Sequence, residues 1–276
     1  MSLSVESFRG PGGATLYYRY DDFTDPWSDR PTIVMAHGHP RNSNMWYAWV
    51  PGLARDFRVV RTDLRGLGLS KVPIETFRNS VDSLMLDAIA LFDHLRIDKA
   101  IWIGEATGAM LGIYLATTVP ERLHCLVAMS IALRIRDAPV PSALAGAEGM
   151  ELMLKKGMRA WAQTSVRNRP WHREAPPGYV QWYADQIAQN DPRLAAEFYR
   201  PMPEIDALPM LKDISVPTLY LSGDRDQMAR PEHLEALRQN PKARVTSIKG
   251  PGYDIGYART EACLTEVRGF LKELGL

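Results

Sequence analysis

Cysteine, basic leaders and long apolar runs are scarce or missing in this sequence. Only Cys125 and Cys263 occur among its 276 residues, so a disulfide framework is not indicated. Residues 1–10 contain no basic stretch followed by an apolar segment, and we therefore expect no secretion signal. No apolar run approaches the ~18 residues that span a bilayer. We expect a cytoplasmic protein that has no membrane partner.

An excess of charge of either sign is also missing. Lysine and arginine total 33 against 32 aspartates and glutamates, which leaves a formal net charge of +1. This balance gives no electrostatic reason to expect a nucleic acid as partner. A small molecule is the expected partner, and a monomer or homodimer the expected state.

Metal and dinucleotide signatures are lacking as well. The six histidines are scattered, and the two cysteines lie far apart, so no spacing typical of a metal site is present. The pair Gly66 and Gly68 lacks the third glycine and the ribose-binding acid of a dinucleotide fingerprint. We therefore expect no metal and no cofactor.

Apolar runs typical of buried strands alternate with helical patterns over most of the chain. Residues 3–9 and 15–20 suggest an antiparallel entry hairpin, and residues 44–53 a helix. Later strands are expected at 31–36, 57–61, 100–103, 123–130, 217–221 and 243–248. This alternation predicts an α/β protein with a mostly parallel sheet flanked by helices.

The alternation stops between residues 134 and 210. This segment has helical patterns broken by prolines and is rich in methionine and aromatic residues. We interpret it as a helical cap. The predicted organisation is a core made of residues 1–133 and 211–276, with the cap at 134–210 inserted in it.

A glycine-flanked turn lies at the centre of the chain. The apolar run 100–103 ends at Gly104, and Gly108 opens a run with small and apolar residues at helical spacing. Glycine on both sides lets the backbone bend sharply, as in a nucleophile elbow, which presents its middle residue at the top of the sheet. Here the middle residue is Ala106, which has no nucleophilic atom.

Four motifs together resemble the α/β-hydrolase superfamily over nearly the whole chain. They are the His37-Gly38 turn, the Asp-x-Arg-Gly-x-Gly-x-Ser segment at 63–70, the elbow at 104–108 and the Gly-Asp-x-Asp turn at 223–226. Residues 37–46 and 63–70 are most similar to the capped branch with enol-lactonases, meta-cleavage hydrolases, dehalogenases and epoxide hydrolases. The resemblance implies an eight-stranded, mostly parallel sheet with a helical cap.

The resemblance also shows which catalytic positions are changed. In that family the triad runs nucleophile, acid, histidine, and these positions correspond here to Ala106, Asp226 and Tyr253. Tyrosine, with a pKa of about 10, cannot replace imidazole as a base at neutral pH. Losing the nucleophile or base costs serine hydrolases on the order of a millionfold in turnover. Ordinary serine hydrolysis is therefore excluded for this chain.

The remaining machinery is suited to other chemistry. By resemblance, the backbone N–H groups of His39 and Thr107 would form an oxyanion hole, to which the helix that begins at Thr107 adds its positive end. Tyr253 and Asp226 would face this hole, and the tyrosine hydroxyl would donate a proton or a hydrogen bond. Such a set suits proton transfer, decarboxylation, retro-aldol cleavage or cyclisation next to a carbonyl.

Residues that bind substrate are expected near the oxyanion turn and in the cap. Arg41 is a candidate for binding a substrate carboxylate, the alternative being an exposed guanidinium without that role. Glu105 is expected to point away from the cleft and to pair structurally, and His37 to be a structural histidine. The cap candidates are Trp161, Trp182 and Tyr183 as pocket walls, or otherwise the cap's own core, and His172 as a displaced base.

Three functions stay open at this point. The first is a cofactor-free enzyme that acts on a small carbonyl-containing substrate through the oxyanion hole and Tyr253 with Asp226. Aromatic compounds are among the substrates considered. The second is an ester, lactone or C–C bond hydrolase inactivated by substitution at positions 106 and 253. The third is a pseudoenzyme or small-molecule receptor that keeps the pocket for binding only.

Overall fold

The computed structural model describes residues 4–137, 144–168, 175–225, 230–250 and 254–276. Asp226, Tyr253 and His172, three of the predicted site residues, lie outside these ranges.

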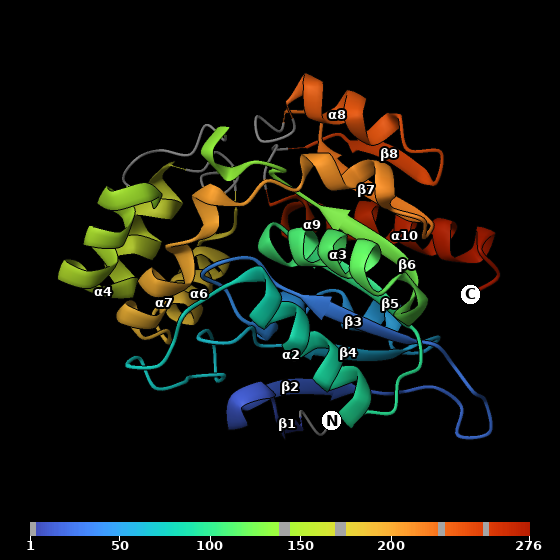
Figure 1. The fold of residues 1–276 in the computed structure, drawn as a ribbon, viewed down its shortest axis with the longest axis horizontal. Coiled ribbons are helices and arrows are strands. Elements are labelled where there is room, and N and C mark those ends of the chain that lie inside the picture. Colours follow the sequence, from blue (N-terminus) through green and yellow to red (C-terminus); the bar gives the residue numbers. More distant parts are fainter. Residues whose placement is uncertain (1–3, 138–143, 169–174, 226–229, 251–253) are drawn as a thin grey trace.

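One eight-stranded sheet forms the centre of the molecule (Figure 1). Its strands are β1 (Val5–Arg9), β2 (Thr15–Asp21), β3 (Thr32–Ala36), β4 (Arg58–Thr62), β5 (Ala100–Glu105), β6 (Leu123–Met129), β7 (Thr218–Gly223) and β8 (Ala243–Ile248), and they lie in the order β1-β2-β4-β3-β5-β6-β7-β8. Strand β2 pairs antiparallel with β1 and with β4, and the other neighbours are parallel. The predicted mostly parallel sheet and its antiparallel entry hairpin are confirmed.

Helices cover both faces of the sheet because both faces are apolar. Strand β5 is buried at every position, and Trp102 and Ile103, which are consecutive, belong to apolar clusters on opposite faces. Helices α2 (Val81–His94), α3 (Thr107–Thr118) and α8 (Pro231–Arg238) pack in the first cluster. Helices α1 (Val50–Leu53), α9 (Ile255–Ala258) and α10 (Thr260–Glu273) pack in the second.

The single helix expected at 44–53 is divided. A 3₁₀ turn, Ser43–Trp46, precedes α1, in which Pro51 occupies the first turn. Proline has no N–H and is tolerated in that turn, whereas inside a longer helix it removes a hydrogen bond. The chain therefore starts a new helix at Val50.

The described residues between 134 and 210 form a helical layer beside one end of the sheet (Figure 1). Its helices are α4 (Gly146–Asn168), α6 (Pro177–Ile187) and α7 (Pro192–Tyr199), and α4 packs against both others. Within α4, Gly157 has non-helical angles (φ 81°, ψ 171°), so the helix is interrupted there. Among the helices of the described ranges, none combines the length and the apolar composition needed to cross a membrane.

Candidate active site at the elbow after β5

Ala106 adopts the strained backbone of an elbow. The residue lies between the end of β5 and the first residue of α3, and it has a φ of 51° and a ψ of −111°. Two hydrogen bonds fix the turn: the Ala106 N–H donates to the Met129 carbonyl at 3.0 Å, and its own carbonyl accepts from the Met110 N–H at 3.0 Å. A positive φ costs energy for any residue with a Cβ, so the surrounding structure imposes this conformation. The half-buried Ala106 methyl group occupies the tip of the turn.

Three glycines, which have no side chain, allow the turn to pack closely against its neighbours. A Cβ on Gly104 would lie 2.2 Å from the Gly108 carbonyl oxygen, and one on Gly108 would lie 2.1 Å from the Ala36 carbonyl oxygen. On the other side of the tip, a Cβ on Gly38 would lie 2.8 Å from the Ala106 Cβ. The turn after β3 therefore lies directly against the elbow tip.

His37 holds the turn after β3 to the rest of the core. Its Nδ1 donates to the Gly38 carbonyl at 3.0 Å, and its Nε2 accepts from the Leu64 N–H at 3.1 Å. Complete burial lowers the pKa of His37 to about 4. The imidazole is thus neutral at pH 7, and both of its nitrogens are used within the protein.

His39 connects the same turn to the helical layer. Its Nε2 donates to the Ala195 carbonyl of α7 at 2.8 Å, and its ring stacks on Phe198 with 5.3 Å between centroids. Burial lowers the pKa of His39 to about 3. The side chain of His39 is therefore neutral and contacts α7, whereas its backbone amide lies in the turn beside the elbow.

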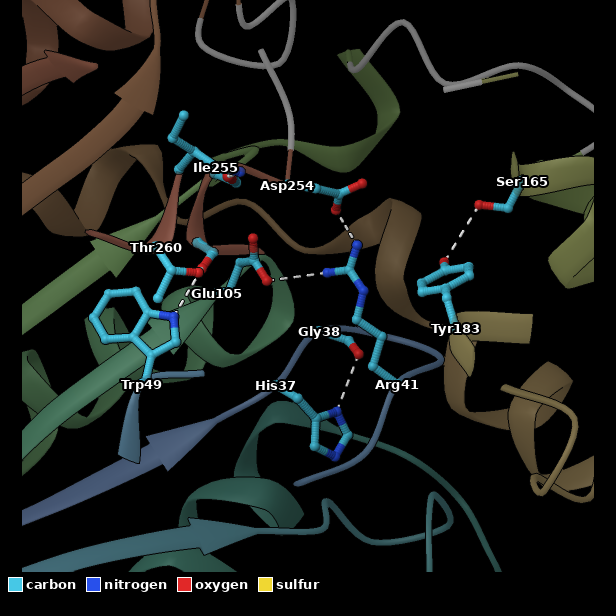
Figure 2. Close-up of polar contacts among 12 residues, drawn as sticks. His37, Gly38, Arg41, Trp49, Glu105, Ser165, Tyr183, Asp254, Ile255 and Thr260 are labelled. Carbon is cyan, nitrogen blue, oxygen red and sulfur yellow. Dashed lines mark hydrogen bonds and ion pairs between the residues drawn. The ribbon is translucent and has the colours of Figure 1, made fainter. Parts of the chain in front are cut away.

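Arg41 is the centre of a buried ionic cluster (Figure 2). Its Nη1 donates to Glu105 Oε2 at 3.1 Å, and its Nη2 donates to Asp254 Oδ1. Arg41 is 2% exposed, and the two carboxylates are 0% and 1% exposed. Burial alone lowers the pKa of Arg41, but the charges of Asp254 and Glu105 outweigh it and hold this pKa well above its ordinary value. Arg41 is thus no exposed guanidinium, and Glu105 pairs inside the protein.

Tyr257 completes this cluster from α9. The guanidinium carbon of Arg41 lies 4.8 Å from the centre of the Tyr257 ring, in cation–π geometry. Burial, followed by the charge of Glu105, raises the pKa of Tyr257 well above its ordinary value. Its phenol therefore stays protonated at neutral pH. The pattern of the sequence did not indicate Asp254 or Tyr257, and their one signal was proximity along the chain to Tyr253, where the resemblance placed the histidine of the triad.

The predicted cap residues differ in their surroundings. Trp161 is 2% exposed and donates from Nε1 to the Leu144 carbonyl at 3.3 Å, within the helical layer. The Tyr183 hydroxyl lies 3.4 Å from Ser165 Oγ, with both residues buried. Trp182 is half-buried, and its ring centre lies 5.0 Å from that of Tyr47, which follows the turn after β3.

The start of α3 provides further polar groups at the elbow. Thr107 is the first residue of α3, and such an amide has no carbonyl partner one turn earlier. Among the described residues, nothing accepts a hydrogen bond from the backbone amides of Thr107 or His39. The same ranges contain no group of three or more side chains able to hold a metal ion.

Comparison with known proteins identifies the family of this fold. The model of the α/β hydrolase fold family matches residues 31–253. The chain is 30% identical over 201 residues to 3-oxoadipate enol-lactonase 2 of Acinetobacter baylyi, covering 72% of this chain and 73% of that protein. The structure of the enol-lactonase from Burkholderia xenovorans LB400 superimposes with a TM-score of 0.85 at 25% identity, covering 97% of this chain and all of that one. The chain belongs to the α/β-hydrolase family.

A shorter match links the chain to a receptor. The Karrikin insensitive 2 receptor IA of Petunia hybrida is 28% identical over 113 residues, which is 40% of this chain and 41% of the receptor. Proteins similar in sequence to this chain thus include an enzyme and a receptor, and similarity alone does not decide between these functions.

Proposed function

We propose that this protein is a cofactor-free enzyme that acts on a small carbonyl-containing substrate at the Ala106 elbow, without a covalent serine intermediate. One observation carries the proposal: the elbow keeps its strained backbone at Ala106 although the residue has no atom that could attack a substrate. A strained turn persists only where its surroundings hold it. Its retained use is to place the start of α3 and the turn after β3 around a substrate oxygen.

The proposed oxyanion hole consists of the backbone amides of His39 and Thr107. Gly38 brings the two turns together, and the positive end of α3 favours negative charge beside Thr107. Donors that are fixed before the reaction stabilise an enolate or a tetrahedral oxyanion without reorganisation. This supports proton transfer, decarboxylation, retro-aldol cleavage or cyclisation next to the carbonyl.

The acid–base partners in this proposal are Tyr253 and Asp226. The turn that precedes Asp226 is tied to the segment that precedes Tyr253, because Asp224 Oδ1 accepts from the Gly250 N–H at 3.0 Å and Arg225 Nε donates to the Gly250 carbonyl at 3.0 Å. Both residues follow these hydrogen bonds within three positions along the chain. Because Asp226 and Tyr253 follow closely on residues that are hydrogen-bonded to each other, these bonds support a Tyr253–Asp226 pair beside the elbow.

The helical layer is proposed as the cap over the substrate. Asn190, which follows α6, donates to the Pro40 carbonyl at 2.7 Å, and His39 donates to the Ala195 carbonyl of α7. The end of α6 and helix α7 therefore both contact the turn after β3, beside the elbow. Trp182 and Tyr183 on α6 face this side of the core, and the layer would shield the substrate from water. An aromatic substrate fits such walls.

The proposal is tested by removing one hydroxyl group. Tyr253→Phe is expected to lower turnover of the true substrate by at least a hundredfold, because general acid–base groups contribute roughly 10²–10⁴-fold. Turnover is measured on substrates selected from a panel of small ketones, lactones and β-keto acids. Tyr20→Phe is the control and should leave the rate unchanged, because Tyr20 lies on β2, which β4 and β3 separate from the elbow strand β5. Equal rates in wild type and Tyr253→Phe would remove Tyr253 from the mechanism.

A double restoration separates this proposal from an inactivated hydrolase. If the chain is an ester or lactone hydrolase altered at two positions, Ala106→Ser with Tyr253→His should give a burst of product from aryl esters. Under our proposal the pair yields little hydrolysis, since the pocket serves other chemistry.

The receptor hypothesis is the second candidate, favoured by the similarity to the Petunia hybrida receptor. It predicts that a small molecule binds at the elbow with no turnover by the wild-type protein. Binding without product across the whole panel would support it against the enzyme.

A further inference from the structure

Arg41 has a fixed side chain with one donor left over. Glu105 and Asp254 hold its two terminal nitrogens, so the guanidinium cannot rotate without breaking an ion pair. Its Nε is buried and has no hydrogen-bond partner among the described residues. A buried donor without a partner is costly, and ligand binding is one way in which such a donor is satisfied.

The free donor lies on the side of the helical layer. In Figure 2, Glu105 lies on one side of the Arg41 guanidinium, and Tyr183 lies on the other, with Ser165 beyond it. Tyr183 is close enough to Arg41 to influence it electrostatically. The Arg41 Nη1 atom also lies near the elbow, 3.4 Å from where a Cβ on Gly38 would be. The Nε–H therefore faces the region between the elbow and helices α4 and α6.

The charge of the cluster determines what the donor can bind. Arg41 contributes one positive charge, and Glu105 and Asp254 contribute two negative charges, so these three side chains have a net charge of −1 when both carboxylates are ionised. His37 and His39 add no positive charge at pH 7, since both are neutral there. A carboxylate brought to this cluster would be repelled in a region of low dielectric.

We propose that Arg41 Nε–H is a specificity group that donates to an uncharged oxygen of the ligand, such as a ketone, ester or lactone carbonyl, and that the site discriminates against carboxylates. This rests on the proposed function only in placing the ligand between elbow and helical layer. It revises the expectation that Arg41 binds a substrate carboxylate. A lactone and its ring-opened acid would thus be distinguished at this residue.

The test follows the Nε–H group of Arg41 by ¹H–¹⁵N NMR at pH 7.5, its signal assigned by its loss in Arg41→Lys. Acetophenone and benzoate are the probes, because they are similar in size and differ in charge. We expect acetophenone to shift the signal and to bind roughly tenfold more tightly than benzoate. In Glu105→Gln, which removes one negative charge, benzoate should gain affinity while acetophenone does not.

A buried arginine outside the site supplies the matched control. Arg61 is 3% exposed and gives two hydrogen bonds to Asp21, with Nε and Nη2 both used. Arg61→Lys should therefore leave both affinities unchanged, whereas Arg41→Lys should weaken acetophenone binding. The proposal is overturned if acetophenone does not shift the Arg41 Nε–H signal, or if benzoate shifts this signal as far as acetophenone does. Since the readout is binding, it can fail while the Tyr253 experiment succeeds, or succeed while that one fails.

Discussion

The two histidines of the turn after β3 are buried as neutral imidazoles, each committed to a backbone partner. His37 bridges Gly38 and Leu64 within the core, and His39 reaches across to Ala195. Burial disfavours the charged form of each ring, because the surrounding groups cannot replace its hydration. Such residues contribute to stability in a way that depends on pH.

Burial of the neutral His37 ring should make the stability of the protein depend on pH. Its pKa is about 4 in the folded protein and about 6.5 when unfolded, so between these values the unfolded chain binds more protons. Stability from His37 is complete above pH 6.5 and is lost as the pH falls toward 4. The free energy of unfolding should fall by about 1.4 kcal/mol per pH unit for this histidine. Urea unfolding between about pH 6.5 and pH 4.5 measures this slope, and His37→Gln should reduce it. An unchanged slope would show that His37 becomes protonated in the folded state.

At the scale of elements, the junction of β5 and α3 depends on how closely two backbones approach. Gly104 and Gly108 lie on either side of Glu105, Ala106 and Thr107, and each touches backbone atoms where a Cβ would be. Backbone atoms cannot move aside as a flexible side chain can. This close packing lets α3 begin directly at the end of the strand and places its amides beside the turn after β3.

Gly108→Ala is therefore expected to lower the free energy of unfolding by about 3 kcal/mol, because the new methyl group would overlap the Ala36 carbonyl. The control is Gly269→Ala on α10, where nothing lies within 4 Å of the added Cβ. That substitution should be neutral or stabilise by up to about 1 kcal/mol, since alanine has the higher helix propensity. Chemical denaturation compares the two. Equal effects would show that the elbow can relax.

At the scale of the whole molecule, amide side chains fasten the helical layer to the core. Asn190 accepts from the Gly68 N–H at 2.8 Å and donates to the Pro40 carbonyl at 2.7 Å. Gln186 receives hydrogen bonds from Asn42 and Asn44, the nearer at 2.7 Å. These bonds join helix α6 to the turns that surround the elbow. The position of the layer over the site thus depends on a few neutral hydrogen bonds.

Asn190→Ala is expected to loosen α6 and α7 from the core. It leaves two backbone groups without their partner, at about 1–3 kcal/mol each. Hydrogen exchange in α6 and α7 should become roughly tenfold faster or more, with the sheet protected as before. Gln189→Ala, at the exposed neighbouring position, is the control. If exchange rises equally in the sheet, the layer and the core unfold together instead of separately.

Local patterns in the sequence were sufficient for much of this molecule. Apolar runs located the strands, and the spacing of Gly104 and Gly108 around Ala106 identified the elbow, because backbone sterics act between near neighbours along the chain. The helix expected at 44–53 was wrong as a single element, since the break between Trp46 and Val50, just before Pro51, was not recognised. The order of four motifs was enough for the fold family.

The tertiary structure alone decided the surroundings of Arg41. Its partners lie 64 and 213 positions away along the chain. They meet it because Arg41 follows β3, Glu105 ends the neighbouring parallel strand β5, and Asp254 directly precedes α9. A periodic pattern carries information about one element and its neighbours, whereas charge pairing depends on distances in space. Sequence therefore determined the strands and the elbow with alanine at position 106. The burial of Arg41, its two carboxylates and its remaining donor follow from how these segments pack.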